Sequence, residues 1–524
     1  MKRKIRKSFV FCLASLLLLA SCKKDLLSDM TLAGHQALDA YQLATAEIGI
    51  QNILGATADS AALATSTLIF TSEGELSTAN GNALFPLSDQ SHDYSFALSL
   101  ADINTLTSIG SLQKNYSDTV TLQIAQQALI KNIKFRAGQL RIRYSTNCKH
   151  DNTFTLTVPM LKQAGIALSH RLDVSYTGIF PAEQEAVIDL TGYTLNLAFN
   201  GAVPSNRFYY TLTDSMTYIG NSLQIDDSTH MTLSFTGLEF SNIDGNFGTL
   251  QLPLMQQSFP LAIFQNVASG SLRFKAPVLN LTMRNSMGMP MTLQWDQITG
   301  QSPITGSHAL VGDTLTRDWA FGVPGSKGKT AIRTIKLNAA NTNLPEMLSH
   351  ASTSILLSGR DSVRQVANTY TYFLTDSSSA GVDAQLQMPL EGSFEDLLLS
   401  DTLSIRTDAF KDEAIKALRL YVENRFPLLA NIQAWPLDAS GGRGEALLTE
   451  EGFTIPSGKI KSGGAVSDPT IVAQTIPISS TQSNQLLQAG RLLIGVKMKS
   501  DSGTDVKLST ASKIKIYIGV QAAR

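Results

Sequence analysis

Apolar and polar residues alternate with a period of two along most of this chain. The alternation is clearest in residues 139–144, 195–200, 279–284, 418–422 and 513–520. A period of two places one face of a strand in a core and the other face toward solvent. Turn residues such as Asp244-Gly245 and Ser440-Gly441-Gly442 separate the runs. The pattern predicts an all-β fold made of tandem antiparallel β-sandwich-like domains.

Helical signals are few and short. Residues 343–348 offer asparagine as an N-cap and a proline in the first turn, and residues 481–489 form a candidate helix closed by Gly490. A third short helix is expected within residues 44–54. These segments predict a few short helices that decorate the sheets.

A strand-turn-strand pattern occurs three times. An alternating strand ends at Asn200, Asn285 or Asn424, and a proline opens the next apolar strand at residue 204, 290 or 427. Asparagine tolerates turn geometry, and proline fixes φ where a strand begins. The spacing differs between the copies, so true duplication and chance turns in a β-rich chain both remain open.

The N-terminus reads as an export signal. Five basic residues within Met1–Lys7 precede an apolar run over residues 9–20. That run is too short to cross a bilayer as a helix, which takes about 20 residues. It ends in Leu19-Ala20-Ser21-Cys22, which resembles the lipobox of bacterial lipoproteins. The resemblance implies removal of residues 1–21 and lipidation of Cys22, with palmitate among the acyl chains that anchor the protein.

The residues after the cleavage site also carry a resemblance. Cys22-Lys23-Lys24-Asp25 looks like the mature start of Bacteroidota lipoproteins, and residue 23 is not the aspartate that retains enteric lipoproteins in the inner membrane. Residues 130–524 resemble outer-membrane lipoproteins of that phylum, and the run from Pro427 to Asp438 is weakly similar to the late-embryogenesis-abundant type-2 β-sandwich. These resemblances imply an outer-membrane cell-envelope protein but no activity. Whether it faces the periplasm or the cell surface stays undecided.

Composition narrows the partners. The net charge of −1 gives no basic field for nucleic acid, which is therefore not an expected partner. Of three cysteines, Cys12 leaves with the signal and Cys22 carries lipid, so Cys148 is left without a disulfide partner. Cys148 lies in a segment typical of a turn between strands, which we favour over a catalytic nucleophile.

Several motifs imitate functional sites. The run from Gly325 to Thr330 resembles a phosphate loop but lacks its first glycine and precedes a predicted strand. Residues 242–246 offer alternating oxygens for calcium without the glutamate that closes an EF-hand loop, so a hairpin turn is preferred. The seven histidines show no zinc-ligand spacing. Trp295, Trp319 and Trp435 could form a sugar-stacking platform, but Trp295 and Trp435 occupy strand positions better suited to a core.

One further pattern concerns modification. Asp followed by Ser or Thr and then an apolar residue or Thr resembles the O-glycosylation signal of Bacteroidota. It places candidate acceptors, expected on exposed loops, at Ser60, Thr119, Ser215, Ser228, Thr314, Ser362 and Thr402.

The expected organisation is a signal peptide (1–21), a lipidated tether (22–44), a β-rich domain (45–270, with a division near 182), a second β-rich domain (271–403) and a C-terminal β-sandwich (404–524). No catalytic, cofactor-binding or metal-binding residues are predicted. The favoured function is a non-enzymatic envelope lipoprotein with a binding or scaffold role. The alternatives are a lipid-handling module that encloses an acyl chain and a glycan-binding or hydrolytic protein with an unseen site.

Overall fold

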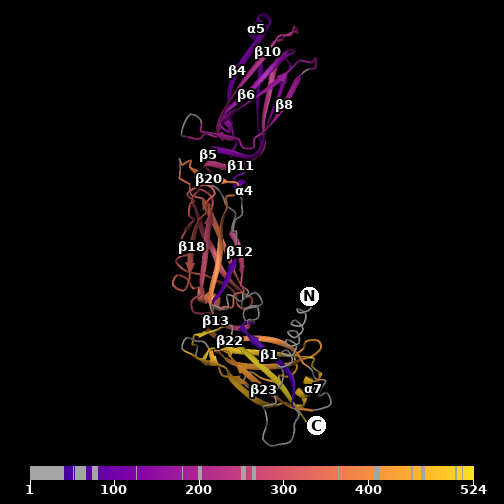
Figure 1. The fold of residues 1–524 in the computed structure, drawn as a ribbon, viewed down its shortest axis with the longest axis vertical. Helices are drawn as coiled ribbons and strands as arrows, with labels where there is room; N and C mark the ends of the chain where they lie inside the picture. Colours follow the sequence, from indigo (N-terminus) through magenta and orange to yellow (C-terminus); the bar gives the residue numbers. More distant parts are fainter. Residues whose placement is uncertain are drawn as a thin grey trace, which may run out of the picture.

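The protein is described here from a computed structural model. It covers residues 40–523 except 51, 53–66, 73–80, 125–126, 180, 199–202, 249–254, 262–266, 364, 367–368, 406, 408–413, 450–451, 462–465, 502–503 and 510. Strands dominate the described part of the chain, as the period-two pattern predicts. They form three units stacked end to end in an elongated molecule (Figure 1), which we call the base, middle and distal units.

The distal unit lies farthest from the chain ends and contains the longest strands. Its elements are β3 (Gln90–Ala97), α5 (Leu100–Ile109), β4 (Ser111–Thr121), β5 (Leu129–Thr146), β6 (Asp151–Gln163), β7 (Ile166–Val174), β8 (Ala182–Asp189), β9 (Thr194–Asn196), β10 (Arg207–Thr217) and β11 (Ser228–Asn246). β9 pairs with both β5 and β6, so it links the two layers of this sandwich.

The middle unit comprises β2 (Thr67–Ser72), β12 (Met255–Pro260), β14 (Val278–Asn285), β15 (Met291–Ser302), β16 (Gly306–Ala309), β17 (Trp319–Ala320), β18 (Ala331–Leu337), α6 (Leu344–Ser349), β19 (Ser354–Val363) and β21 (Ala380–Pro389). α4 (Gly81–Leu84) and β20 (Tyr372–Thr375) lie where it meets the distal unit (Figure 1).

The base unit contains both ends of the described chain. Its elements are β1 (Ala40–Gly49), β22 (Glu391–Ser404), β23 (Ala414–Asn424), β24 (Leu429–Leu437), β25 (Thr454–Ile455), β26 (Lys459–Ile460), β27 (Val466–Asp468), β28 (Thr470–Pro477), α7 (Ser480–Gln488), β29 (Arg491–Lys499), β30 (Val506–Lys507) and β31 (Lys513–Ala523). β13 (Val267–Phe274) pairs with β22 at its edge, although it lies between β12 and β14 in the chain.

The three units repeat one strand topology. One layer has the order β1-β31-β23-β28 in the base, β2-β21-β14-β18 in the middle and β3-β11-β5-β8 in the distal unit. The facing layer has the order β22-β29-β24-β25, β12-β19-β15-β17 and β4-β10-β6-β7. A shared order of eight strands in three units points to duplication of one sandwich.

Buried turn residues support the repeat in atomic detail. Asn424 ends β23, accepts from the amide of Phe426 (2.9 Å) and donates to the carbonyls of Leu428 and Pro456 (2.9 Å each). Asn285 ends β14 and makes the same three kinds of contact, with the amide of residue 287 and the carbonyls of residues 289 and 322. The predicted second and third strand-turn-strand copies are therefore equivalent.

The first predicted copy is not equivalent to the other two. Residues 194–196 form the short linking strand β9, and Asn200 lies outside the described residues. The matching turn in the distal unit follows β5, where the buried Thr146 hydroxyl accepts from the amide of Cys148 (3.1 Å). Threonine replaces asparagine there, so a search for asparagine and proline misses this copy.

The units are nested along the chain, whereas the sequence led us to expect consecutive domains. β1, β2 and β3 start the base, middle and distal units in turn, and the chain then completes the three units in reverse order. The expected border at 270/271 falls inside β13, and that at 403/404 falls inside β22. Pairing of the first strand with the last, as in β1 with β31, leaves no local signal in the sequence.

The predicted helices have mixed outcomes. α6 and α7 confirm two of them, and α7 begins with a capping box formed by Ser479 and Gln482. The helix expected within residues 44–54 is wrong over residues 44–49, which belong to β1 (Ala40–Gly49) because their apolar side chains pack with those of β31, whereas Ile50 and Asn52, the described residues of the rest of this segment, are helical. α5 was missed, although Ser99 and Asp102 form a capping box at its start.

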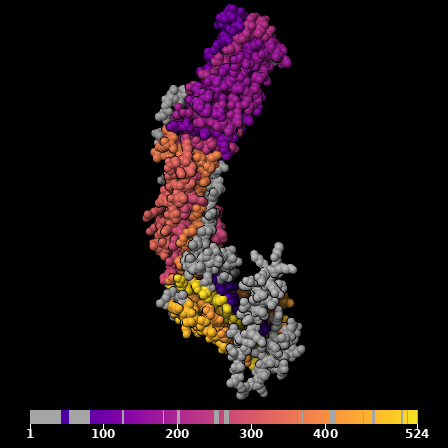
Figure 2. All heavy atoms as spheres, viewed as in Figure 1, coloured from indigo at the N-terminus to yellow at the C-terminus, as the bar shows by residue number. Residues whose placement is uncertain are grey.

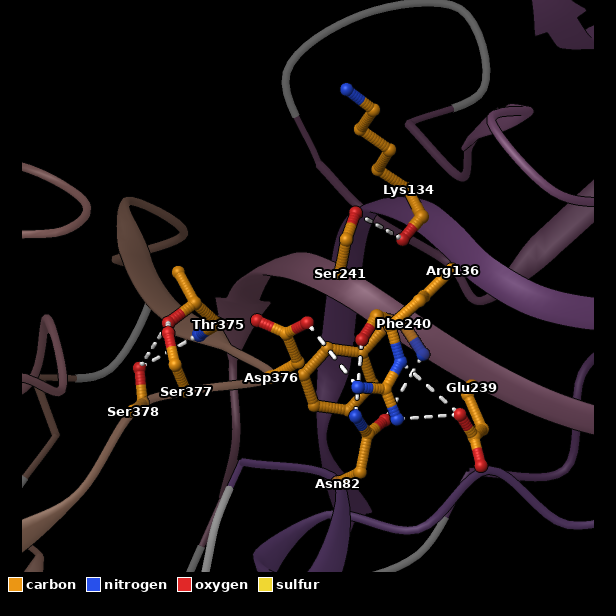
Figure 3. Close-up of polar contacts among 10 residues, drawn as sticks. All are labelled: Asn82, Lys134, Arg136, Glu239, Phe240, Ser241, Thr375, Asp376, Ser377 and Ser378. Carbon is orange, nitrogen blue, oxygen red and sulfur yellow. Dashed lines mark hydrogen bonds and ion pairs between the residues drawn. The ribbon is translucent and has the colours of Figure 1, made fainter.

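Pairing across unit borders holds the stack together. β20 of the middle unit pairs with β11 of the distal unit, and β13 pairs with β22 of the base. Near β20, Asn82 exchanges two hydrogen bonds with the backbone of Phe240, and Arg136 bridges Glu239 and Asp376 (Figure 3). Most buried apolar residues of the three units belong to one cluster of contacting side chains that continues across the unit borders.

Candidate functional site

The sequence-predicted modification sites are spread over the chain. Cys22 and Ser60 lie outside the described residues. Five of the other candidate acceptors lie in strands and not in loops: Thr119 in β4, Ser215 in β10, Ser228 in β11, Ser362 in β19 and Thr402 in β22. Thr314 lies in a turn, and only Ser362 and Thr402 are exposed. O-glycosylation at these positions stays a prediction.

Cys148 lies in the turn between β5 and β6, as expected from the sequence. Its side chain is buried, and burial raises the pKa of the thiol to about 11. Because the thiolate is the nucleophilic form, a thiol with so high a pKa is a weak nucleophile at neutral pH.

The tryptophans do not form a common platform. Trp295 and Trp319 pack edge to face in the middle unit with ring centroids 5.3 Å apart, and both are buried. Trp435 belongs to the base unit and is half-buried on the outer face of β24, with the guanidinium of Arg443 5.2 Å from its ring. The core position expected for Trp295 is confirmed, and that expected for Trp435 is wrong.

The two segments that imitate a phosphate loop and a calcium loop lie side by side. The hairpin turn expected for residues 242–246 is wrong, because these residues form the end of strand β11 and pair with β5 and β20. Lys327, in the turn between β17 and β18, contacts the side chains of Asn242 (2.5 Å) and Asp244 (2.6 Å) on β11. The ammonium group thus binds the side-chain oxygens that a calcium ion would have needed as ligands. These residues pair the middle unit with the distal unit.

The open side of the distal sandwich carries a different kind of surface. β3 is paired with β11 and β4 with β10, and within the described chain neither has a second partner, so each is an edge of its layer. Their inward-facing side chains meet between the layers. We call this set the β3–β4 seam; it consists of His92, Tyr94, Phe96, Lys114, Tyr116 and Asp118.

The repeat supplies an internal comparison for the β3 side of the seam. Phe96 pairs with Thr229, which also pairs with the turn residue Thr146. In the base unit, Ile48 pairs with Ile514, which also pairs with the turn residue Asn424. Counting from these positions, His92, Tyr94 and Phe96 replace Ala44, Ala46 and Ile48. The base unit shows that small or aliphatic side chains suffice to close this side of the sandwich.

The β4 side of the seam differs from the base unit in the same way. Lys114, Tyr116 and Asp118 stand where β22 has Leu399, Asp401 and Leu403, by the pairing of β4 with β10 and of β22 with β29. The base position is hollowed to about 200 Å³ beside Ile48, Leu399 and Asp401. The distal unit fills the matching space with aromatic and charged side chains.

The seam rings contact one another but are only half-buried. The ring centroids of Tyr94 and Tyr116 are 5.3 Å apart, and those of Phe96 and Tyr116 are 4.8 Å apart. Burial together with nearby carboxylates raises the pKa of Tyr94 to about 12 and that of Tyr116 still further. Both hydroxyls therefore stay protonated and can donate hydrogen bonds at neutral pH.

Lys114 carries the seam's positive charge. Its ammonium group forms an ion pair with Asp102 at the start of α5. On the opposite strand, His92 Nε2 lies 3.7 Å from Asp118 Oδ2, which is beyond hydrogen-bonding distance.

A buried hydroxyl without a partner lies behind the seam. Tyr210, on β10 directly opposite Asp118, is fully buried, and its hydroxyl has no hydrogen-bond partner among the described residues. Its ring meets that of His92 edge to face at 6.0 Å. Burial and the negative charge of Asp118 raise the pKa of Tyr210. A buried polar atom that lacks a partner costs free energy, about 1–3 kcal/mol.

A buried carboxyl group lies deeper in the same unit. Asp214 on β10 is almost fully buried, and the hydroxyl of Tyr144 lies 3.3 Å from both its oxygens. Burial raises the pKa of Asp214 to about 7, and the hydrogen bonds from Tyr144 and Thr229 oppose this only in part. Asp361 occupies the equivalent place in the middle unit, with a pKa raised to about 6 by burial, and Val496 occupies it in the base.

Other features of the described chain offer less chemistry. A wide shallow hollow of about 480 Å³ in the middle unit is lined by residues 311–313 and 340–343. Among the residues placed in the structure, no three His, Cys, Asp or Glu side chains are grouped as metal ligands would be. None of the helices described is long and apolar enough to span a bilayer.

The seam could not be identified from the sequence. The alternation of His92, Tyr94 and Phe96 with polar residues indicates a strand, but nothing in it shows that β4 lies opposite. The usable signal was indirect, because this strand carries aromatic rings where a strand that only closes a sandwich needs aliphatic side chains.

Known proteins show little similarity to this chain. No protein-family model matches the chain, and no curated protein matches it. Among solved structures, a Parabacteroides distasonis protein described as secreted is 13% identical, covers 58% of this chain and 86% of its own, and has a TM-score of 0.29. The PBSX exported protein XepA is 9% identical over 57% of this chain and 86% of its own, with a TM-score of 0.13. These scores are too low to carry a functional argument.

Proposed function

We propose that this chain is a non-enzymatic lipoprotein of the bacterial outer membrane that holds a binding surface away from its lipid anchor. Three stacked sandwiches form the spacer, and the distal unit carries the surface. The proposal joins the predicted lipidation of Cys22 to the nested topology. The resemblance of residues 19–25 to Bacteroidota lipoproteins supports the membrane assignment.

The position of β1 carries the proposal. β1 begins at Ala40, 18 residues after Cys22 (40 − 22), and lies within a sheet of the base unit. A lipid on Cys22 would therefore hold the base unit nearest to the membrane. Figure 2 shows the distal unit at the opposite end of the elongated molecule. In a chain of consecutive domains the last unit would be farthest from the anchor, but here the inserted unit is.

The packing of the stack suits a spacer. Each border is crossed by paired strands, β20 with β11 and β13 with β22, so bending at a border would break backbone hydrogen bonds. At the lower border, Gly392 lies so close to the Arg273 carbonyl that an added Cβ would be 2.1 Å from its oxygen. Tight packing of this kind resists hinge motion.

The test measures two things separately: the lipid anchor, and the height of each unit, meaning its distance from the membrane. Palmitate labelling and cell fractionation should show a lipidated membrane protein, and Cys22→Ala should lose both the label and the membrane fraction. Next, a fluorophore on Thr177→Cys, at the free end of the distal unit, is compared with one on Ser440→Cys in the base, in lipoprotein reconstituted into vesicles with a membrane-bound quencher. The base label should be quenched more strongly. A labelled Cys22→Ala protein, or stronger quenching of the distal label, would refute the proposal.

A further inference from the structure

The residues of the β3–β4 seam differ from their counterparts in the base unit in a way that suggests a ligand. The fold closes the same side of the base unit with Ala44, Ala46 and Ile48 on β1, so this side of a sandwich does not need the aromatic residues that β3 carries. The rings of Tyr94 and Tyr116 are half-buried, so part of each ring is open to a ligand. The difference between the two units therefore calls for a ligand.

The chemistry of the seam argues against two ligand classes. An acyl chain prefers aliphatic walls, yet none of the six seam residues is aliphatic. A metal cation needs several ligands, but Asp118 is the one acidic residue of the seam, Asp102 beside it is paired with Lys114, and no three His, Cys, Asp or Glu side chains are grouped among the described residues. What remains is a cluster of tilted aromatic rings, each with a partly accessible face, edged by hydrogen-bonding groups of both kinds.

Such a surface suits a carbohydrate. A sugar ring has an apolar C–H face that lies on an aromatic ring and a rim of hydroxyls that both donate and accept hydrogen bonds. Tyr94 and Tyr116 provide the rings and two hydroxyl donors, and Asp118 provides an acceptor. Behind them, the hydroxyl of Tyr210 and Nε2 of His92 are buried and lack hydrogen bonds within the described chain, so the ligand contacts fall to the ring faces, the two tyrosine hydroxyls and Asp118.

We propose that the β3–β4 seam of the distal unit binds a carbohydrate, with Tyr94 and Tyr116 as the stacking residues. This inference deepens the proposed function, since it names the ligand class of the surface that the spacer would carry. Binding depends only on the distal unit. It can therefore fail while anchoring and height hold, or hold while they fail.

The experiment is affinity electrophoresis of the mature chain carrying Cys22→Ser in gels that contain dextran, mannan, xylan, a mixed-linkage β-glucan or soluble peptidoglycan fragments. At least one of these polymers should retard the protein, and its dissociation constant is then measured by calorimetry. Tyr94→Ala should weaken binding by about tenfold or more. It should also fold, because Ala46 holds the matching place in the base unit.

Tyr421→Ala is the matched control. Tyr421 and Tyr517 form a half-buried tyrosine pair in the base unit with centroids 5.8 Å apart. Its loss should change binding less than about twofold. Tyr94→Leu keeps apolar bulk without the ring and should bind as weakly as Tyr94→Ala. Continued protection of the Cys148 thiol shows that the distal unit of each variant is folded.

Tyr210→Phe is a second control, placed behind the seam. The hydroxyl is buried and has no partner in the described chain, so its removal should leave both the fold and the binding intact. Three results would overturn the proposal: no retardation by any of the five polymers, binding by Tyr94→Leu equal to wild type, or equal losses in Tyr94→Ala and Tyr421→Ala. Binding that survives Tyr94→Leu would point instead to a peptide strand added to the β3 edge.

Discussion

Replacing Asp214 with asparagine should make the distal unit more stable at neutral pH. The carboxyl group is almost fully buried with no cationic partner among its hydrogen bonds, and burial raises its pKa from 3.8 to about 7. The folded chain therefore binds this proton more tightly than the unfolded chain. Stability is greatest below about pH 4, falls as the pH rises toward 7, and is constant above that.

The pKa difference sets the size of the effect. Each pKa unit corresponds to 1.36 kcal/mol, so a pKa that rises from 3.8 to about 7 corresponds to roughly 4 kcal/mol of lost stability above pH 7. Asparagine can still accept from Tyr144 but carries no charge. Asp214→Asn should therefore match wild type near pH 4 and exceed it by up to about 4 kcal/mol at pH 8.

The chain offers a reporter for each part of the molecule. In protein carrying Cys22→Ser, Cys148 is the one thiol left in the mature chain, and it lies buried in the distal unit. Its reaction with a dipyridyl disulfide during urea titration reports unfolding of that unit. All three tryptophans lie in the middle and base units, so their fluorescence is the internal control. A variant no more stable than wild type at pH 8, or a gain that does not change with pH, would refute the reasoning.

Three further outcomes are expected. Asp361→Asn should stabilise the middle unit by up to about 3 kcal/mol above pH 6, because burial raises the pKa of Asp361 to about 6, and tryptophan fluorescence should show no gain below pH 4. Asn424→Ala should cost about 3 kcal/mol in urea unfolding, since it removes three buried hydrogen bonds; a loss no larger than that of the exposed Asn115→Ala would contradict this. Gly392→Ala should raise hydrogen exchange in β13, because its Cβ would lie 2.1 Å from the Arg273 carbonyl oxygen, whereas Gly325→Ala, with open space around its Cβ, should not.

Local patterns in the sequence determined the class of fold and several elements. Alternation at 279–284 and 418–422 marks β14 and β23, because a strand that buries one face must place apolar residues at every second position. Proline in the first turn of α6 and the glycine after α7 likewise act within a few residues. Such signals predict elements well because their causes are local.

The tertiary structure alone decided how those elements combine. β1 carries short-range signals compatible with a helix, and only its pairing with β31, more than 460 residues away, makes it a strand. The nested order of the units depends on such distant pairings, and so does the meeting of Lys327 with Asp244. The energy of these contacts depends on which strands lie side by side, which no short window of sequence records.

The candidate site depends on both the local sequence and the tertiary structure. Tyr94 and Tyr116 lie outside the segments in which apolar and polar residues alternate most clearly, and the sequence made neither residue a candidate. The structure placed β3 opposite β4 and matched the aromatic residues of β3 to aliphatic residues of β1 in the base unit. A binding surface formed by two edge strands exists only once both layers of a sandwich have assembled, because each strand supplies one half of it.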